Sequence, residues 1–445
     1  MDKQRRKVLG HHKERNSMKI GIDITVLQTG HRKRGVGYTL INFINHLSND
    51  ARKDHQFVFY KYPDEATEDP LNLLETQDLS YEVRTVQRPN TKGFNLPGKF
   101  SVVNSFRNYA ITKKDMLLGD SRITQVRDLD WFLQFDQHQL LPPKHKVKST
   151  LILYDLIQYI MESDYLPSYK TARSKKHSRK GSLRLHLLRR NYLKKMKKNT
   201  RRAKSLVAIS EHTKKDFIRL VGVPAKKISV ALLGVEPLLN KSVEKAPTFD
   251  YYVDTSWGYL PKSLNLDNKK FLLFVGGADP RRKLVDLVAA FNNLRAQGHD
   301  IKLVLAGDTM LGAFKVPHLE LQKYLKHTSY LDDIYFVGFV DDQQRDWLYQ
   351  NALAFVYPSV YEGFGLPVLE AMQYGTPVIT YKNSSIEEIA GNAALYANDY
   401  WSIAEHVSSL IDNNNLKADY SKRGTIQAAK FSWEKTARGI LESAG

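Results

Sequence analysis

The sequence predicts an α/β protein with two Rossmann-like domains, and three observations support this prediction. The chain has 445 residues, which exceeds one typical hydrophobic core and suggests about two to three domains. Apolar, strand-like runs alternate with stretches of helical periodicity in both halves of the chain. The hydrophobic fraction of 42% is ample for globular folding, so global disorder is excluded.

The first half opens with the order strand, loop, helix, strand. The loop is rich in glycine and basic residues, and these opening elements are expected at 18–27, 30–37, 38–47 and 55–62. Two further strands and a helix are expected at 149–155, 205–210 and 211–222. Residues 61–130 show no clear pattern. We therefore expect an N-terminal domain at 18–235, preceded by a disordered basic tail at 1–17.

The second half repeats the alternation of strands and helices. It begins near Lys269 with the strand pattern FLLFV, and a loop and a helical pattern follow. A linker with proline interruptions and little periodicity is expected at 236–268, and a C-terminal domain at 269–424. Loops at the carboxyl ends of parallel strands are where such sheets bind ligands, so site residues are expected there.

The most informative stretch runs from Tyr357 to Thr380, with the sequence YPSVYEGFGLPVLEAMQYGTPVIT. Within it, Glu362 and Glu370 enclose a Gly-Phe-Gly turn that leads directly into a helical pattern. Small residues let backbone amides approach a ligand, and a helix N-terminus favours an anion. The two carboxylates can bind hydroxyl groups on either side of a phosphate. This arrangement suits a nucleotide sugar, in which a diphosphate separates a ribose from the transferred sugar.

This stretch resembles the retaining nucleotide-sugar glycosyltransferases of the GT-B fold, in particular family four. The family signature, E-x7-E within EGFGLPxLEAMxxGxPV, is matched almost letter for letter. The resemblance implies two Rossmann-like domains that face a central cleft. It also implies that Glu362 lies beside the donor sugar and that Glu370 binds the ribose hydroxyls. The backbone between them would contact the diphosphate, through Gly363, Phe364, Gly365 and Leu366.

The resemblance covers most of the chain from Met18 onward. The runs IGID and GVGYT resemble the N-terminal strand and glycine loop of the family, so Gly35 and Gly37 join the expected donor-binding residues. The last segment, 425–445, is expected to form a helix that packs back on the N-terminal domain.

A diphosphate also needs cations, and the run VGGADPRRKL supplies them. Gly276 and Gly277 end a strand, and Arg281, Arg282 and Lys283 are expected to open the next helix. The family places an Arg or Lys pair here against the donor diphosphate, and Arg282 occupies the usual Lys position. Because Arg can hold a phosphate in a bidentate grip, this exchange is chemically plausible.

One position departs from the family pattern. Many relatives have a His at the end of the strand that matches LILYDLIQY, and here that residue is Tyr154, followed by Asp155. Tyrosine is a poor proton carrier near neutral pH, since its reference pKa is about 10. Either Tyr154 positions the donor, or it caps the core, or Asp155 or a neighbour such as Asp136 or His138 acts instead, or the enzyme is impaired.

The net charge of +20 is concentrated in two segments. Residues 1–17 contribute +4, residues 170–204 contribute +16, and the rest of the chain is balanced. Leu185, Leu188, Tyr192 and Met196 fit one face of a basic helix within 170–204. Such a helix can lie on an anionic membrane surface, although its apolar face could instead pack internally. Nucleic acid is a weaker alternative, and no nucleic-acid partner is expected, because no recognition motif accompanies the charge.

Several functional classes are excluded or disfavoured. The absence of cysteine excludes disulfides, thiol catalysis and Cys-based zinc sites. No signal-peptide core and no apolar run of spanning length is present, so the chain is expected in the cytoplasm. The pairs Asp332-Asp333 and Asp341-Asp342 are interpreted as surface loop residues. No metal site or cofactor is therefore expected, and the reaction is expected to be metal-independent.

The sequence thus predicts a retaining glycosyltransferase that transfers a hexose from a UDP- or GDP-sugar to an acceptor hydroxyl. The acceptor would be a glycan or a lipid-linked molecule, in polysaccharide or glycolipid synthesis at the inner face of the cell membrane. The resemblance implies a front-face reaction in which the departing phosphate helps to deprotonate the acceptor. Catalysis would rest on Glu362, Arg281 and Arg282, with Tyr154 and Asp155 on the opposite side. Two alternatives stay open: a catalytically impaired, membrane-associated scaffold, or a nucleic-acid-binding protein with this fold.

Overall fold

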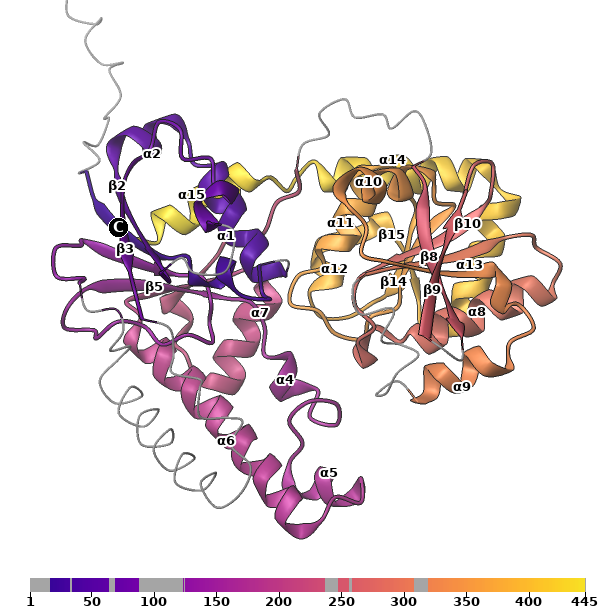
Figure 1. Cartoon of the computed structure of the whole chain (residues 1–445), viewed down its shortest axis with the longest axis horizontal. Helices are drawn as coiled ribbons and strands as arrows, with labels where there is room; N and C mark the ends of the chain where they lie inside the picture. The colour runs from indigo at the N-terminus through magenta and orange to yellow at the C-terminus, as the bar shows by residue number, and fades with distance from the viewer. Residues whose placement is uncertain are drawn as a thin grey trace, which may run out of the picture.

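A computed structural model describes residues 17–32, 34–63, 69–87, 123, 125–236, 247–255, 258–307 and 319–444. Two α/β lobes lie side by side, each built on a parallel sheet (Figure 1). The predicted fold class is therefore confirmed. The expected disordered tail at 1–17 lies outside the described residues except for Ser17. Of the stretch 61–130, which the sequence left unassigned, residues 64–68, 88–122 and 124 also lie outside them.

The N-terminal sheet has the strand order β3-β2-β1-β4-β5-β6-β7, and all neighbours are parallel. Its strands are β1 Lys19–Asp23, β2 Gln56–Lys61, β3 Ser80–Thr85, β4 Trp131–Gln134, β5 Lys148–Leu153, β6 Ser205–Ala208 and β7 Ile228–Val230. The sequence prediction missed β3 and β4. Strand β4 has only four residues, all buried, so it shows neither the length nor the alternation that identifies a strand.

The helices of this lobe are α1 Gly35–Asn45, α2 Asn49–Asp54, α4 Ile157–Ile160, α5 Tyr169–Ser174, α6 Arg179–Arg202 and α7 Glu211–Asp216. The strand expected at 18–27 is shorter than predicted. It ends at Asp23, whose carboxylate accepts hydrogen bonds from the backbone N–H and the hydroxyl of Thr25. These bonds turn the chain into a 3-10 turn at Thr25–Gln28.

The basic stretch 170–204 forms two helices instead of the single helix that the sequence predicted. Helix α5 ends at Ser174, and α6 begins after Ser178, whose hydroxyl accepts a hydrogen bond from the N–H of Gly181. Lys176, between the two helices, has a φ of +63°, which ends the first helical path, and the Ser178 cap satisfies an amide in the first turn of α6. The α5–α6 pair projects from the N-terminal lobe (Figure 1).

The C-terminal sheet has the order β12-β11-β10-β13-β14-β15, again all parallel. Its strands are β10 Phe271–Val275, β11 Lys302–Ala306, β12 Ile334–Gly338, β13 Ala354–Tyr357, β14 Val378–Tyr381 and β15 Ala394–Ala397. Its helices are α8 Leu284–Ala296, α9 Leu319–His327, α10 Asp342–Asn351, α11 Leu366–Gln373, α12 Ser384–Ala390, α13 Tyr400–Asp412 and α14 Asn414–Ala428. The strand order reverses between β10 and β13, and this switch point is where such sheets bind ligands.

The stretch expected to be a linker, 236–268, is more ordered than predicted. It contains an antiparallel hairpin, β8 Phe249–Thr255 and β9 Gly258–Leu264, which packs on β12. Phe249 is buried with its ring 5.7 Å from that of Trp347. Packing against the C-terminal lobe stabilises the hairpin, which local periodicity alone does not reveal.

The C-terminal end of the chain crosses between the lobes. Ser432 pairs with Val235, and α15 Trp433–Glu442 lies against α1. The predicted boundary at 425 falls inside α14, where Gly424 packs against Met372, so the crossing begins only after this helix ends. Among the helices that the structure describes, none combines the length and the apolar character needed to traverse a bilayer.

Candidate active site at the domain interface

Two loops at the switch point of the C-terminal sheet carry the site. One follows β10 and holds the glycine and arginine pairs, and the other follows β13 and holds Glu362. The backbone N–H of Val360 donates to the carbonyl of Arg281 at 2.8 Å, which ties the loops together. Gly276 has a φ of +147°, a conformation that favours glycine, and an added Cβ there would collide with Arg282.

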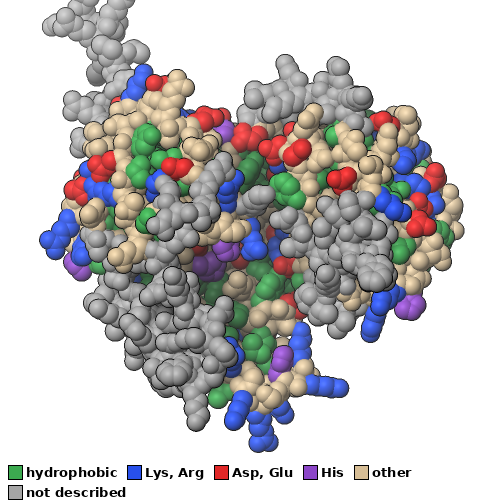
Figure 2. All heavy atoms as spheres, in the orientation of Figure 1, with side chains coloured by type: hydrophobic (Ala, Val, Ile, Leu, Met, Phe, Trp, Pro, Cys, Tyr) green, Lys and Arg blue, Asp and Glu red, His purple; other side chains and the backbone are tan. Residues whose placement is uncertain are grey.

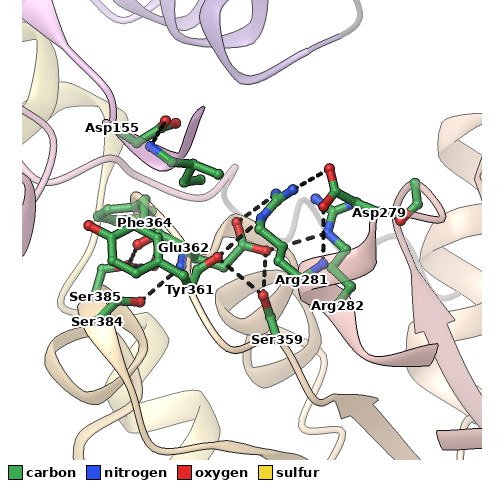
Figure 3. A network of polar contacts seen from close by, with 12 residues as sticks. Asp155, Asp279, Arg281, Arg282, Ser359, Tyr361, Glu362, Phe364, Ser384 and Ser385 are labelled. Carbon is green, nitrogen blue, oxygen red and sulfur yellow. Dashed lines mark hydrogen bonds and ion pairs between the residues drawn. The ribbon is translucent and has the colours of Figure 1, made fainter. Parts of the chain in front are cut away.

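The carboxylate of Glu362 lies at the centre of a dense polar network (Figure 3). It accepts hydrogen bonds at 2.8 Å from the Tyr357 hydroxyl and at 2.9 Å from the Ser359 hydroxyl. It also pairs with Arg281 Nη2 at 3.1 Å and with Arg282 Nε at 3.4 Å. Only 7% of the residue is exposed. The two guanidinium groups and the carboxylate thus form one buried ionic cluster.

The protonation state of Glu362 follows from this network. Burial by itself raises the pKa of a carboxyl, but the nearby charges of Arg281 and Arg282 outweigh that effect and lower the pKa of Glu362 to about 2. Glu362 is therefore ionised throughout the neutral range. It can orient the arginines or accept a hydrogen bond from a sugar hydroxyl, but it cannot supply a proton to a leaving group.

The two arginines of this cluster differ in how many of their side-chain nitrogens are already hydrogen-bonded. Within the described residues, Arg282 Nε contacts Glu362, Nη1 donates to the carbonyl of Gly277 at 3.0 Å, and Nη2 makes no hydrogen bond. Arg281 is engaged through all three side-chain nitrogens. Arg282 Nη2 is therefore the guanidinium N–H group of this pair that is available to an added phosphate.

The prediction that three basic residues open the next helix was wrong. Arg281 and Arg282 lie in a 3-10 turn at Pro280–Arg282, which Asp279 caps, and helix α8 begins only at Leu284. Lys283 separates the two, with φ 45° and ψ 44°, and its side chain is exposed. The left-handed backbone at Lys283 interrupts the helical path.

The Gly-Phe-Gly turn contacts the N-terminal domain. The carbonyl of Gly363 accepts hydrogen bonds from Ser210 at 2.8 Å and from Thr213 at 3.2 Å. A Cβ on Gly363 would lie 2.5 Å from the carbonyl oxygen of Tyr154 and 2.9 Å from the Cβ of Asp155. Only glycine fits here, because atoms of the N-terminal domain occupy the space that a side chain would need.

The other two residues of the turn have different surroundings: Phe364 is in the core, and Gly365 precedes the N-terminus of α11. Phe364 is buried, with its ring 6.2 Å from that of Phe431. Its side chain therefore serves packing, although its backbone remains in the loop. Gly365 has a φ of +114° and precedes Leu366, the first residue of α11. The first amides of a helix have no intrahelical acceptor, so this end can receive an anion.

Glu370 lies one turn into α11 and is partly exposed. Within the described residues it accepts one hydrogen bond, from the Tyr349 hydroxyl at 2.9 Å. Burial, and then the charge of Glu370, raise the pKa of Tyr38 in the first turn of α1. The start of α1 therefore lies within the electrostatic reach of Glu370.

The predicted glycines of the N-terminal domain occupy the start of that same helix. Gly35 is exposed, and a Cβ added there would meet no atom within 4 Å, whereas a Cβ on Gly37 would lie 2.3 Å from the carbonyl oxygen of Arg32. The need for glycine at Gly37 thus arises from the loop's own backbone. The structure brings the first turn of α1 within the electrostatic reach of Glu370, while neither glycine shows a described contact with the Glu362 cluster.

Tyr154 and Asp155 end up in different surroundings. The Tyr154 side chain lies in the main hydrophobic core, where burial raises its pKa and the nearby Thr39 side chain opposes that rise. Its hydroxyl has no partner in hydrogen-bonding geometry among the described residues. Asp155 lies beside Gly363 and accepts a hydrogen bond from the N–H of Ile157 at 2.9 Å. Burial raises the pKa of Asp155, while the charges of Arg281 and His138 oppose that rise.

The alternative candidates Asp136 and His138 lie on the same side. Burial lowers the pKa of His138, and the carboxylates of Asp136 and Asp155 act in the opposite direction. The backbone N–H of His138 donates to Asp136 at 2.8 Å. The structure therefore places His138 and Asp155 in one electrostatic neighbourhood of the N-terminal domain, facing the Glu362 loop.

Sequence reasoning missed several residues of the site. Tyr357, Ser359, Asp279 and Tyr165 contact the Glu362 cluster or its arginines, and Tyr349 contacts Glu370. The Asp-Pro pair before the arginines is a recognisable 3-10 or helix start and could have identified Asp279. Tyr165 carries no local signal, since it lies in an irregular stretch far away in sequence.

The expected absence of a metal site can be compared with the described ranges only. There, no three His, Asp or Glu side chains gather as ligands of an ion would. Of the aspartate pairs, Asp333 forms ion pairs with Arg295 and Lys302, and Asp341 caps α10. These residues have structural partners. Metal independence itself stays a prediction.

Comparison with known proteins agrees with this geometry. Residues 259–427, which include the arginine loop, Glu362 and Glu370, match the family model "Glycosyl transferases group 1". This region is therefore similar to group 1 glycosyl transferases. O-antigen chain mannosyltransferase B of Escherichia coli is 29% identical over 242 residues, which cover 52% of this chain and 58% of that protein. The serotype-specific mannosyltransferase WbdA of Escherichia coli is 26% identical over 247 residues, or 54% of this chain and 28% of the relative.

The chain spans less than two thirds of the length of these relatives, so the match is a similarity in one region and does not extend to their whole activity. Solved structures extend over nearly the whole chain. HepE from Anabaena, in complex with UDP and glucose, has a TM-score of 0.57 and 16% identity, covering 96% of this chain and 98% of its own. WaaG, a glycosyltransferase of lipopolysaccharide biosynthesis, has a TM-score of 0.57 and 12% identity, covering 94% and 97%. At such identities the likeness shows the fold, which is GT-B.

Proposed function

We propose that this protein is a retaining glycosyltransferase that transfers a hexose from a nucleotide-sugar donor to an acceptor hydroxyl. One observation supports the proposal above all: the buried cluster of Glu362, Arg281 and Arg282 lies at the switch point, beside the N-terminus of α11. The cluster offers a free guanidinium N–H group, helix amides and an ionised carboxylate within one site. These are the groups that a sugar diphosphate requires.

Each group has a distinct role in the proposed reaction. Arg282 Nη2 and the amides at the start of α11 would bind the diphosphate and stabilise the charge that develops when it leaves. Glu362 would accept a hydrogen bond from the transferred sugar, and Glu370 would bind the ribose. The leaving phosphate would help to deprotonate the acceptor hydroxyl, so no side chain has to act as the general base.

Donor and acceptor remain to be chosen by experiment. The two relatives are named as mannosyltransferases, one of them of the O-antigen chain, and HepE was solved in complex with UDP and glucose. UDP- and GDP-hexoses are therefore the first donors to test. The acceptor would be a glycan or a lipid-linked molecule of a cell-surface polysaccharide or glycolipid. A thermal-shift screen over UDP-, GDP-, ADP- and TDP-sugars should raise the melting temperature for one nucleotide class, because donor binding stabilises the folded state.

The same screen tests the proposal. Hydrolysis or transfer should then be measured for the donor that binds, with and without excess chelator. Binding and turnover that survive the chelator agree with a metal-independent transferase. Binding without turnover would instead favour the scaffold, and abolition by chelator would overturn metal independence. Stabilisation by none of the four classes would contradict the proposed donor site.

The proposed reaction takes place at the inner face of the cell membrane, and the start of α6 supports this. Leu183, Leu187 and Leu188 expose 46–52% of their surface, among cations such as Arg184 and Arg190. Figure 2 shows Lys and Arg gathered at the tip where Figure 1 places α5 and the beginning of α6. Exposed leucines among cations are typical of helices that lie on anionic lipid surfaces.

The two halves of α6 have different surroundings. The apolar face expected from the sequence is therefore not uniform along the helix. Tyr192 and Leu193 pack on a core cluster together with the fully buried Met196, so they support the fold. Leu188 is exposed although it shares a face with Tyr192 in the helical pattern. Only the first half of α6 is therefore available to lipid.

The membrane proposal is tested on vesicles with and without anionic lipid. Replacing Lys180, Arg184 and Arg190, which are exposed in the first half of α6, with Gln should release the protein from anionic vesicles. Attachment of the wild type should weaken as salt rises. A matched control replaces Lys323, Lys326 and Lys422, which are exposed on the other domain, and should bind as the wild type does. Equal release by both triple variants would show that net charge, and not this helix, drives attachment.

A further inference from the structure

A loop of the N-terminal domain reaches across the interface to an arginine of the candidate active site. The loop lies between α4 and α5 and carries Tyr165. The Tyr165 hydroxyl donates a hydrogen bond to Asp279 and accepts one from Arg281 Nη1 at 3.3 Å. One phenol therefore joins two residues of the opposite domain that are themselves paired, with Arg281 Nη1 and Asp279 Oδ2 2.7 Å apart.

Tyr165 is one of several partners that hold the guanidinium of Arg281. Its Nε donates to the carbonyl of Tyr361 at 3.1 Å, and its Nη2 contacts Glu362 at 3.1 Å. Asp279 and Tyr165 hold the remaining nitrogen, Nη1. With all three nitrogens engaged and the side chain only 11% exposed, the guanidinium has one orientation. Tyr165 is the one of these partners that comes from the other domain.

The loop that carries Tyr165 is itself fastened to α6. Arg189 donates to the carbonyls of Tyr159 at 2.6 Å and Leu166 at 2.9 Å, and it pairs with Glu162 at 3.3 Å. Its guanidinium also lies 3.7 Å from the centre of the Tyr159 ring. Arg189 is therefore not one of the free cations of the basic helix. It spans the loop and holds both flanks of Tyr165 in place.

We propose that Tyr165 is a positioning residue that holds Arg281 against Glu362 from the opposite domain, and that Arg189 fixes the loop that presents it. The arginine cluster is then complete only when the two domains are together. The contact links the part of the chain with the proposed lipid-facing helix to the donor site. The expected effect of Tyr165 on turnover rests on the proposed glycosyl transfer. The expected effect of Tyr165 on the arginine loop does not.

The first test compares Tyr165→Phe with Tyr169→Phe, an exposed tyrosine on α5 that serves as the matched control. Hydrogen exchange of the donor-free protein should rise in residues 277–283 of Tyr165→Phe and stay unchanged in the control. This readout needs no activity. Unchanged exchange of that loop in Tyr165→Phe would overturn the positioning role, whether or not the protein proves to be a transferase.

The second test measures kcat and donor KM for UDP-glucose or GDP-mannose, whichever donor the wild type uses. Tyr165→Phe should lower kcat by about 10- to 100-fold, because small misplacements of a catalytic group are costly, while KM changes much less. A purely structural defect would lower the melting temperature and affect both domains, so the melting temperature is recorded in parallel. Wild-type kcat in Tyr165→Phe would overturn the proposal, whereas a wild type that uses no donor would overturn the proposed function alone.

The third test asks whether Arg189 acts through Tyr165. Arg189→Lys keeps a charge beside Glu162 but loses the planar grip on two carbonyls, so it should lower kcat in the same direction. If the two residues form one chain, the double variant should lose less than the product of the single losses. Independent, fully multiplicative losses would contradict the role of Arg189.

Discussion

The two glutamates of the signature differ sharply in their surroundings. Glu362 is buried and is held by two hydroxyls and two guanidinium groups. Glu370 is partly exposed, and within the described residues its carboxylate accepts a single hydrogen bond, from Tyr349. The same residue type therefore serves two purposes. Glu362 is part of the protein's own architecture, whereas Glu370 is left with acceptor capacity for a ligand.

The largest effect is expected from Glu362→Ala. This change leaves Arg281 and Arg282 buried side by side without their carboxylate, and breaking a buried pair costs about 3–5 kcal/mol. Unfolding monitored by urea or heat should show this loss in the donor-free protein. Glu387→Ala is the control, since Glu387 and its partner Lys382 are both exposed, and it should cost under about 1 kcal/mol. A loss of stability of similar size in the two variants would contradict the view that the buried Glu362 stabilises the fold more than an exposed glutamate does.

The stability of the protein at acid pH should reflect the buried ion pairs of Glu362. The pKa of Glu362 lies at about 2 in the folded protein, below its ordinary value of 4.5, so its stabilisation is present above pH 4.5 and is lost as pH falls towards 2. A shift of this size corresponds to at most about 3 kcal/mol. The stability of Glu362→Gln should therefore fall less steeply over this pH range than that of the wild type. Parallel curves would contradict an ionised, arginine-paired Glu362.

Glu370→Ala should affect donor binding more than the stability of the fold. Loss of a charge-assisted hydrogen bond to ribose should weaken donor binding by roughly 1.5–3 kcal/mol. The melting temperature of the donor-free protein should fall less than in Glu362→Ala, because the change removes one hydrogen bond, from the buried Tyr349, and no ion pair shown among the described residues. Calorimetry with the donor found in the screen measures the affinity. Equal donor binding by wild type and variant would remove the ribose assignment.

Gly363→Ala tests how closely the Glu362 loop fits the N-terminal domain. The new methyl would lie 2.5 Å from the carbonyl oxygen of Tyr154, so the loop or the domain must shift. Such overpacking costs about 1–3 kcal/mol, and the shift should lower turnover as well. Gly30→Ala is the matched control, because an added Cβ there meets nothing within 4 Å. Unaltered stability and turnover in Gly363→Ala would show that the interface is loose.

The smallest effect is expected from Tyr154→Phe. The Tyr154 hydroxyl is buried without a described hydrogen-bond partner, so its removal should change stability by less than about 1 kcal/mol. Transfer should remain measurable if the leaving phosphate acts as the base. Tyr357→Phe removes a hydrogen bond to Glu362 and should cost more. Complete loss of transfer in Tyr154→Phe, with donor binding intact, would show that this hydroxyl takes part in the chemistry.

The sequence predicted one side of the site better than the other. Glu362, Glu370 and the intervening loop are recognisable because a glycine turn, a proline at the helix start and a helical pattern follow one another within a few residues. The N-terminal side offers no such local grouping. Tyr165 lies 114 residues before Asp279, with which it is bonded, and no periodicity relates the two.

The basic segment shows a second limit of sequence reasoning. The count of cations in 170–204 was visible, but their surroundings were not. Arg189 looks like its neighbours in the sequence, yet it is engaged with two carbonyls, a carboxylate and an aromatic ring. Leu188 and Tyr192 share a helical face, yet one is exposed and the other packs on a core. Periodicity gives the face of a helix but not the point along it where the neighbouring core ends.

The sequence by itself determined the alternation of strands and helices, the two-domain organisation, the family resemblance and the loop that holds both glutamates. These features are local, because they depend on side-chain periodicity and on turn residues a few positions apart. Only the tertiary structure decided that Glu362 is buried between two arginines, that Tyr154 turns into the core, and that Tyr165 reaches Arg281. These features join distant segments, so they depend on how the two domains pack and on the burial that results.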